Sequence, residues 1–313
     1  MPTTAHYAMT VIAWGLTWTA IHVQVDSLPL PVSIFYRFAL AAGLLLALTA
    51  WNGSLTRVRP GVHGWLVLQG VCLYSVNFLF LYQATALIPS GFVAVVFSLA
   101  SLLNAGNAWL FFRQRPPLRW LAAALLGAAG LALVFHDEFK WAGGGWLGPA
   151  CALVGTYVFS LGNMVGARVQ RYGLGVFPAN AYAMSYGALL LGALIVVRDL
   201  PVALPADAGY WGAMAFLVII GSVLGFGSYL TLVRRIGAAR AGYATVLFPV
   251  VALTASTWLE GYTWTLTAVV GTAMVILGNL IMFWPAVRRD VLRRRRTANT
   301  AAVEVEGRDA EAG

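Results

Sequence analysis

The chain has 313 residues, of which 60% are hydrophobic and only 10% are charged, with a formal net charge of +9. A single soluble core cannot bury so much apolar surface, so this composition excludes an ordinary soluble globular domain. Apolar segments of about 20 residues can cross a bilayer as helices, and the chain is expected to be an all-α integral membrane protein. The ten segments predicted as membrane spans are Tyr7–Val25, Val32–Trp51, Gly64–Tyr82, Gly91–Phe112, Leu118–Phe135, Gly145–Val165, Ala179–Val197, Tyr210–Ile236, Ala241–Leu259 and Leu266–Trp284.

The positive charge is concentrated in every second loop between these segments. Ten arginines lie in or beside the even-numbered loops, whereas the other loops hold only Lys140 and Arg198. The positive-inside rule therefore predicts that the even loops and both termini face the cytoplasm. Because membrane topology accounts for the charge, no nucleic-acid partner is expected. The ten arginines are Arg57, Arg59, Arg113, Arg115, Arg119, Arg168, Arg171, Arg234, Arg235 and Arg240.

An internal repeat is indicated by two stretches, 82–135 and 229–283, that share their order of features. Each has an aromatic-rich helix end, a tight turn, a crossing segment and a helix with spaced glycines, in which Gly130 corresponds to Gly278 and Ala123 to Gly271. Two consecutive units of five helices must enter the membrane from opposite sides, which is the inverted repeat of many secondary transporters. The sequence therefore predicts two inverted five-helix repeats, at 7–135 and 145–284.

The remaining stretch, 285–313, is predicted to be a disordered cytoplasmic tail. It begins with six arginines in the nine residues from Arg288 to Arg296 and continues with a polar, acidic segment. The arginines are expected to lie against anionic lipid and to anchor the topology, and the rest has the composition of a disordered segment. A regulatory role is the alternative.

Short motifs occur at ordered places over about residues 7 to 284. They are Ala13-Trp14-Gly15-Leu16-Thr17-Trp18, Tyr36-Arg37-Phe38, Ser160-Leu161-Gly162-Asn163, the run from Leu232 to Ala241 (LVRRIGAARA), Pro249, and Glu260-Gly261. This ordered set resembles the EamA-type members of the drug/metabolite transporter superfamily. Two departures lie in the first half, where Ala100-Ser101 replaces a frequent proline and Gln114 lies near the position of the usual glutamate.

The resemblance implies a ten-helix carrier of the bacterial inner membrane, whose central cavity is lined mainly by spans 1, 3, 4, 6, 8 and 9. It also implies transport of small metabolites such as amino acids, nucleosides or drugs. We expect export of amino acids or related amphipathic compounds by alternating access. Efflux of drugs or toxic compounds is the alternative, and a non-transporting membrane sensor or scaffold is less favoured.

Other classes of function are disfavoured by the chemistry of the polar residues. The four histidines and scattered acids form no catalytic cluster, so no enzymatic activity and no catalytic residue are expected. Cys72 and Cys151 are expected to be packing residues, and no cofactor or metal is predicted. The expected partners are a small-molecule substrate and the lipid bilayer, with the chain as a monomer or a homodimer.

Aromatic and polar side chains recur at spacings of three or four residues, and so on one helix face, in several of the spans that the resemblance assigns to the cavity. Such a lining suits a largely apolar or zwitterionic solute, although helix–helix hydrogen bonds could also explain each polar residue. The predicted substrate-binding residues are Trp14, Trp18, Arg37, Tyr74, Asn77, Phe78, Tyr157, Ser160, Asn163, Phe226 and Tyr229.

Arg37 is the only charged residue predicted well inside a span. Buried cations in membranes are costly and usually face a partner or an aqueous cavity. Arg37 is therefore a candidate contact for an anionic group such as a substrate carboxylate. Snorkelling to the interface, or pairing with backbone carbonyls, is the favoured interpretation, because this arginine also belongs to the general pattern of the family.

The eleven acidic residues all fall in loops, at helix ends or in the tail. Proton-coupled carriers usually titrate an acid or a histidine within the membrane, so passive facilitation or exchange is favoured, and a coupling group at a cavity mouth stays open. Glu260 is the acid nearest a span. It is expected to cap the start of the last helix, with proton sensing as the alternative.

Overall fold

The computed structural model describes residues 1–116, 118–141, 145–236, 241 and 243–281. These residues form helices joined by short loops, and no strand occurs among them. The predicted tail and the turn at 237–240 lie outside the described residues. The helices of the first half are α1 (Thr3–His22), α2 (Leu30–Trp51), α3 (Pro60–Val71), η1 (Cys72–Val76), α4 (Asn77–Leu87), α5 (Ser90–Ser98), α6 (Ala100–Phe112) and α7 (Arg119–Trp141).

The second half repeats this succession of long and interrupted helices. Its elements are α8 (Leu147–Gln170), α9 (Val176–Val197), α10 (Ala208–Phe216), η2 (Leu217–Phe226), α11 (Gly227–Ile236), α13 (Tyr243–Val246), α14 (Phe248–Leu259) and a last helix at Leu266–Ile281. A helix overlaps every predicted span, and most boundaries differ by a few residues. The third span is longer than predicted, because α3, η1 and α4 form one helix of 28 residues from Pro60 to Leu87.

Six of the described helices are long and apolar enough to cross a membrane, and three shorter apolar helices accompany them. The all-helical membrane architecture is therefore confirmed, while the count of ten crossings stays a prediction. The six are Leu30–Trp51, Pro60–Leu87, Ser90–Phe112, Leu147–Gln170, Val176–Val197 and Ala208–Ile236.

The interruptions occur in pairs. The third and eighth predicted spans each contain a π-helical segment, η1 and η2, and such segments are frequent at functional sites. The fourth predicted span is interrupted at Leu99, between α5 and α6. The ninth is interrupted at Leu247, between α13 and α14, just before Pro249. Proline at that place begins a helix readily because its missing N–H has no partner within the first turn.

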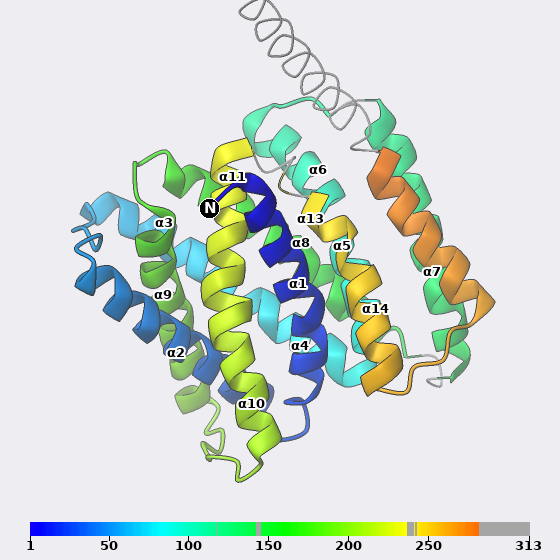
Figure 1. Ribbon diagram of the computed structural model, residues 1–313, viewed down its shortest axis with the longest axis horizontal. Helices are drawn as coiled ribbons and strands as arrows, with labels where there is room; N and C mark the ends of the chain where they lie inside the picture. Colours follow the sequence, from blue (N-terminus) through cyan, green and yellow to red (C-terminus); the bar gives the residue numbers. More distant parts are fainter. Residues whose placement is uncertain (117, 142–144, 237–240, 242, 282–313) are drawn as a thin grey trace, which may run out of the picture.

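The bundle has a dense centre and a separate pair of helices at one edge. α1 packs against η2, α11, α5 and α14, and α8 packs against α4 and α6. In Figure 1, α7 and the last helix (orange) lie side by side at the edge. A Cβ on Gly130 would lie 2.6 Å from the Gly271 carbonyl oxygen, and one on Gly271 would lie 2.5 Å from the Gly130 carbonyl oxygen. The two backbones therefore touch at this crossing, as small residues allow between membrane helices.

Candidate functional site

A small cavity lies in the centre of the bundle, enclosed by six elements. Its volume is about 20 Å³, and its wall is aromatic apart from a threonine, a leucine and the guanidinium of Arg37. It is formed by α1, α2, α4, α5, α8 and η2, so both halves of the chain contribute. The lining residues are Trp14, Thr17, Trp18, Arg37, Phe78, Leu81, Phe97, Phe159 and Phe226.

Arg37 is completely buried in this wall. It lies seven residues into α2, about 10 Å along the helix axis from its first residue. Its Nε donates to Ser222 Oγ at 3.0 Å, but Nη1 and Nη2 have no hydrogen-bond partner among the described residues. The Tyr82 hydroxyl donates its proton to Gln24 Oε1 at 3.1 Å, and its oxygen is left as a neutral acceptor that interacts with the guanidinium.

The surroundings of Arg37 are aromatic. The guanidinium carbon lies 4.5 Å from the centre of the Phe78 ring and 5.1 Å from that of Phe38. Ring faces stabilise a cation, but they leave its in-plane N–H donors free. Because Arg37 reaches neither solvent nor a backbone carbonyl, the geometry does not support the snorkelling alternative. A buried guanidinium with unused donors is suited to bind an anionic oxygen.

An aromatic layer centred on Trp14 lies beside this cavity. The Trp14 Nε1 donates to the Gly221 carbonyl oxygen at 2.9 Å, which fixes the indole against η2. Its ring centre lies 4.7 Å from Phe226 and 4.9 Å from Tyr229. A Cβ on Gly225 would lie 2.5 Å from Trp14 Nε1, so this residue must be glycine for the indole to fit. Phe97, Phe159 and Phe248 complete the layer around the same ring.

A polar layer follows, between α6, α8 and α11. Asn163 Nδ2 donates to Asn104 Oδ1 at 3.2 Å and to the Tyr229 hydroxyl at 3.4 Å. Asn107 Nδ2 donates to Ser160 Oγ at 2.9 Å. Asn163 Oδ1 and Asn104 Nδ2 have no hydrogen-bond partner within the described ranges of the chain. Ser160, Asn163 and Tyr229 were expected to line the site, whereas Asn104 and Asn107 were missed, although two asparagines three residues apart in an apolar span meet the same criterion.

A vestibule of about 450 Å³ connects this polar layer with one end of the bundle. Asn104 and Met164 line its inner part, and Gln170, Arg171 and Arg234 line the part nearer the helix ends. This is the end that the arginine distribution predicts to face the cytoplasm. Tyr229 joins the layers, because its ring packs on Trp14 and its hydroxyl accepts from Asn163.

Two other predicted residues lie next to the cavity without lining it. Tyr74 packs its ring 4.9 Å from Phe226 and donates its hydroxyl to Asn180 Oδ1 of α9 at 2.9 Å. This hydrogen bond joins two helices, which is the alternative explanation given above for polar residues in the spans. Asn77 is fully buried, and neither its Oδ1 nor its Nδ2 has a hydrogen-bond partner among the described residues.

Tyr157 is not brought together with the other predicted residues. It is 41% exposed, on a face of α8 that also carries the exposed Leu153 and Val154. Successive steps of three residues drift around a helix. The side chains of Tyr157 and Asn163, six residues apart, therefore point in directions that differ by about 120° around the α8 axis. The structure therefore places Tyr157 on the exposed side of α8, while Ser160 and Asn163 are buried.

Glu260 caps a helix, but not the predicted one. Its carboxylate accepts from the backbone N–H of Ser90 at 3.1 Å and from the Ser90 hydroxyl, at the start of α5. The expected cap on the last helix was wrong, because the turn after α14 brings the side chain to the first half instead. The contact ties α14 to the turn between α4 and α5, at the end of the bundle opposite the vestibule.

The described residues offer no ordinary metal or redox centre. No three His, Cys, Asp or Glu side chains among them lie close enough to hold a metal ion. Cys72 and Cys151 are buried and free. The chemical features of the site are therefore one buried cation, π faces, amides and hydroxyls.

The EamA-like transporter family model matches residues 6–136 and again residues 146–284. The chain belongs to the EamA-like transporter family. The inner membrane transporter YedA of Escherichia coli (strain K12) is 28% identical to this EamA-like protein over 273 residues, covering 85% of this chain and 87% of YedA. The family and these relatives indicate a multi-pass inner-membrane transporter rather than an enzyme.

Other relatives of this EamA-like protein carry substrate names. A Salmonella typhimurium protein named "probable amino-acid metabolite efflux pump" is 23% identical, covering 90% of this chain and 95% of its own. A Streptantibioticus cattleyicolor protein named "probable terminal-alkyne amino-acid exporter" is 27% identical, covering 93% and 95%. A crystal structure with 18% identity and a TM-score of 0.67, covering 91% of this chain and 98% of that one, shares the fold.

Proposed function

We propose that this protein is a secondary transporter that exports small amphipathic carboxylates, amino acids or close relatives of them, through the central cavity. The observation that carries the proposal is Arg37, a fully buried guanidinium at the wall of an aromatic cavity, whose Nη1 and Nη2 have no hydrogen-bond partner in the part of the chain that the structure describes. A carboxylate would accept from both nitrogens, while its apolar remainder would pack on the rings of Trp18 and Phe78.

The route has three successive parts. A solute entering the vestibule meets the polar layer at Asn104 and Asn163, then the aromatic layer around Trp14, and finally Arg37. The central cavity of about 20 Å³ has room for roughly one water molecule, far less than an amino acid. Binding therefore requires the aromatic layer to move, which is the expected behaviour of a carrier that alternates between states open to opposite sides of the membrane.

The symmetry of the interruptions supports an inverted repeat as the basis of that movement. The π-helical segments occur in the third span of each half, and the broken helices in the fourth. In the fifth spans, Gly130 meets Gly271, and a Cβ on Gly278 would lie 2.8 Å from the Ala123 carbonyl oxygen. Since Gly130 corresponds to Gly278 and Ala123 to Gly271, these contacts are reciprocal, as a two-fold relation in the membrane plane requires.

The names of two relatives support the substrate class. One is named for amino-acid metabolite efflux and the other for export of a terminal-alkyne amino acid. Such solutes join a carboxylate to an apolar group, which is the chemistry offered by Arg37 and its rings. The described acids all lie outside the cavity wall, so exchange or facilitated export fits better than proton coupling through an acid in the membrane.

Counterflow in proteoliposomes tests this function. Purified protein would be loaded with one unlabelled solute, and uptake of labelled phenylalanine, leucine and valine would be compared with uptake of phenylalaninamide and phenethylamine, which lack the carboxylate. Accumulation of an amino acid above empty-liposome controls, with little accumulation of the amide or amine, supports the proposal. Equal accumulation of all three types favours an exporter of apolar compounds in general, and no counterflow by correctly folded protein argues against transport of this class.

A further inference from the structure

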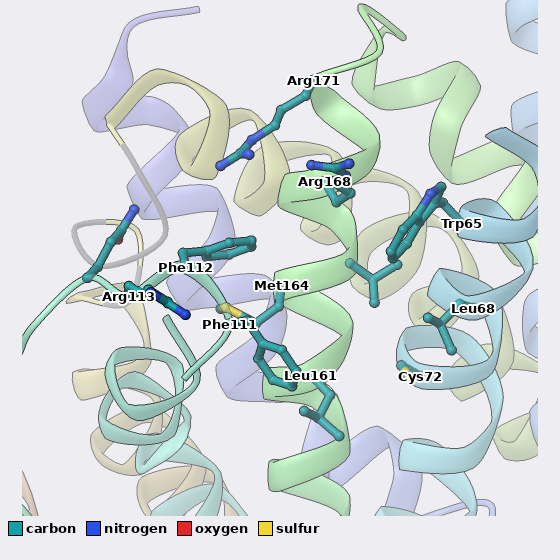
Figure 2. Close-up of a pocket in the computed structure, with 12 residues that line it drawn as sticks. Trp65, Leu68, Cys72, Phe111, Phe112, Arg113, Leu161, Met164, Arg168 and Arg171 are labelled. Atoms are coloured by element: carbon teal, nitrogen blue, oxygen red, sulfur yellow. The ribbon is translucent and has the colours of Figure 1, made fainter. Parts of the chain in front are cut away.

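A second, larger cavity lies on the outer side of α8, between α3 and α6. Its volume is about 750 Å³, and its lining changes along α8 from apolar to basic. Leu68, Cys72 and Leu161 form the apolar part, and Arg168 and Arg171 stand at the other end (Figure 2). Leu161 and Arg171 are ten residues apart, about 15 Å along the helix. We call this cavity the α8 groove.

The α8 groove opens towards the surface that the bilayer covers. The face of α8 below it carries the exposed side chains of Leu153, Val154 and Tyr157, and the groove continues that face. Its two banks are exposed as well, since Leu68 of α3 is 41% and Phe111 of α6 is 54% exposed. An apolar channel that opens sideways into the membrane is filled by lipid chains, because contact between water and its apolar wall is unfavourable.

The arginines at the end of the groove are held in place by rings. The guanidinium carbon of Arg168 lies 5.7 Å from the centre of the Trp65 ring, and that of Arg171 lies 5.2 Å from the Phe112 ring. Figure 2 shows Arg168 beside Trp65 and above the apolar part of the groove. Stacking of this kind orients a guanidinium while leaving its donors free for an anion.

No acid of the transport segments competes for these arginines. Every Asp and Glu before residue 285 lies in one of the odd-numbered loops, at the opposite end of the bundle by the predicted topology: Asp26, Asp137, Glu138, Asp199, Asp207 and Glu260. The net positive charge at the mouth of the groove is therefore uncompensated by the neighbouring loops. A cation pair above an apolar channel matches the order of charge and chain in an anionic phospholipid.

We propose that the α8 groove binds one anionic phospholipid of the cytoplasmic leaflet, with its phosphate on Arg168 and Arg171 and an acyl chain along Leu68, Cys72 and Leu161. The groove differs from the transport route, because Arg37 and the central cavity lie on the other side of α8. It adjoins the vestibule, since Phe112, Met164 and Arg171 line both. A bound lipid would therefore line one side of the vestibule and stabilise the packing of α6 against α8.

Native mass spectrometry of the delipidated full-length protein tests the proposal, with phosphatidylglycerol and phosphatidylethanolamine of identical chains added at equal concentration. The wild type should retain phosphatidylglycerol preferentially. Arg168→Gln should weaken its retention about fivefold, which is the effect of one basic residue near a lipid surface. Leu161→Trp should weaken it without changing charge, by filling the apolar part. Arg59→Gln, an exposed arginine of another even loop, should retain the lipid like the wild type.

Four results would overturn the proposal. Equal retention of both lipids by the wild type would show that the groove does not select an anionic headgroup. Unchanged retention by Arg168→Gln would show that Arg168 does not bind the phosphate. Displacement of phosphatidylglycerol by glycerol phosphate at a similar concentration would show that a free phosphate binds instead. Loss of amino-acid counterflow by Arg168→Gln in liposomes of phosphatidylethanolamine alone would assign the groove to the solute route. A monodisperse size-exclusion peak for each variant separates these results from misfolding.

Discussion

The guanidinium of Arg37 lies 4.5 Å from the centre of the Phe78 ring, and both side chains line the same cavity from neighbouring helices of the first half. Phe78 is the nearer of the two rings beside a cation whose Nε donates to Ser222 but whose Nη donors have no hydrogen-bond partner among the described residues. A cation–π contact contributes roughly 2 kcal/mol when desolvated, which is less than the several kcal/mol that burial of an ion costs. An anionic ligand would supply the missing stabilisation.

Arg37→Gln is expected to lower counterflow of phenylalanine at least about tenfold, while counterflow of phenylalaninamide changes little. The reason is that glutamine keeps polar contacts with Ser222 but cannot form a charge-assisted pair, which contributes about 1.5–3 kcal/mol. Arg37→Lys should retain part of the activity, because its ammonium keeps the charge but lacks the planar fork. An equal loss for both solutes in well-folded protein would show that Arg37 has a structural role.

Trp18→Ala and Tyr229→Ala are expected to reduce flux strongly while leaving the amount of protein in the membrane unchanged. Trp18 Nε1 is buried and has no hydrogen-bond partner among the residues that the structure describes, and Tyr229 connects the aromatic and polar layers. Tyr229→Phe should retain the packing on Trp14 and lose only the bond from Asn163, so its defect should be milder. Counterflow normalised to protein content measures this, and wild-type flux in both alanine variants would remove these residues from the route.

Gly271→Ala is expected to destabilise the pair formed by α7 and the last helix. Its new Cβ would lie 2.5 Å from the Gly130 carbonyl oxygen, so the backbones would have to separate. Overpacking of this kind costs about 1–3 kcal/mol, which should lower the melting temperature in detergent by several degrees. Gly212→Ala is the matched control, because nothing lies within 4 Å of the Cβ that it adds. Equal melting temperatures for both variants would contradict the backbone contact.

The helical architecture followed from the sequence because span length, apolarity and arginine placement are properties of short segments. The spacing of Ser160 and Asn163 places both on the buried side of α8, and their role in binding stays a prediction. Tyr157 lies on the exposed side, because spacing gives the relative angle of two residues and not the direction of the cavity. The cap of Glu260 on Ser90 could not be predicted either, since it joins residues 170 positions apart. The π-helical turns of η1 and η2 depend on packing and leave no pattern in the sequence.

Glu260→Ala is expected to open the end of the bundle opposite the vestibule. Its carboxylate holds the first turn of α5 through the N–H and hydroxyl of Ser90, and so adds a hydrogen-bonded link between this turn and the end of α14. Losing a helix cap costs about 1 kcal/mol, and here the loss also removes a contact between the two halves at this end of the bundle. Ile88, which is 5% exposed next to Glu260 in a surface cavity, should become accessible.

The measurement is the rate at which a membrane-impermeant thiol reagent labels Ile88→Cys in a chain whose two native cysteines are replaced by alanine. Adding Glu260→Ala should raise that rate several-fold. Asp207→Ala serves as the control, because Asp207 caps α10 within its own half through Gly209 and Tyr210 and joins no other element. The two changes remove equivalent helix caps. If both raise the labelling rate equally, general loosening of the bundle explains the effect. If only Glu260→Ala raises it, the contact between Glu260 and Ser90 keeps this end closed.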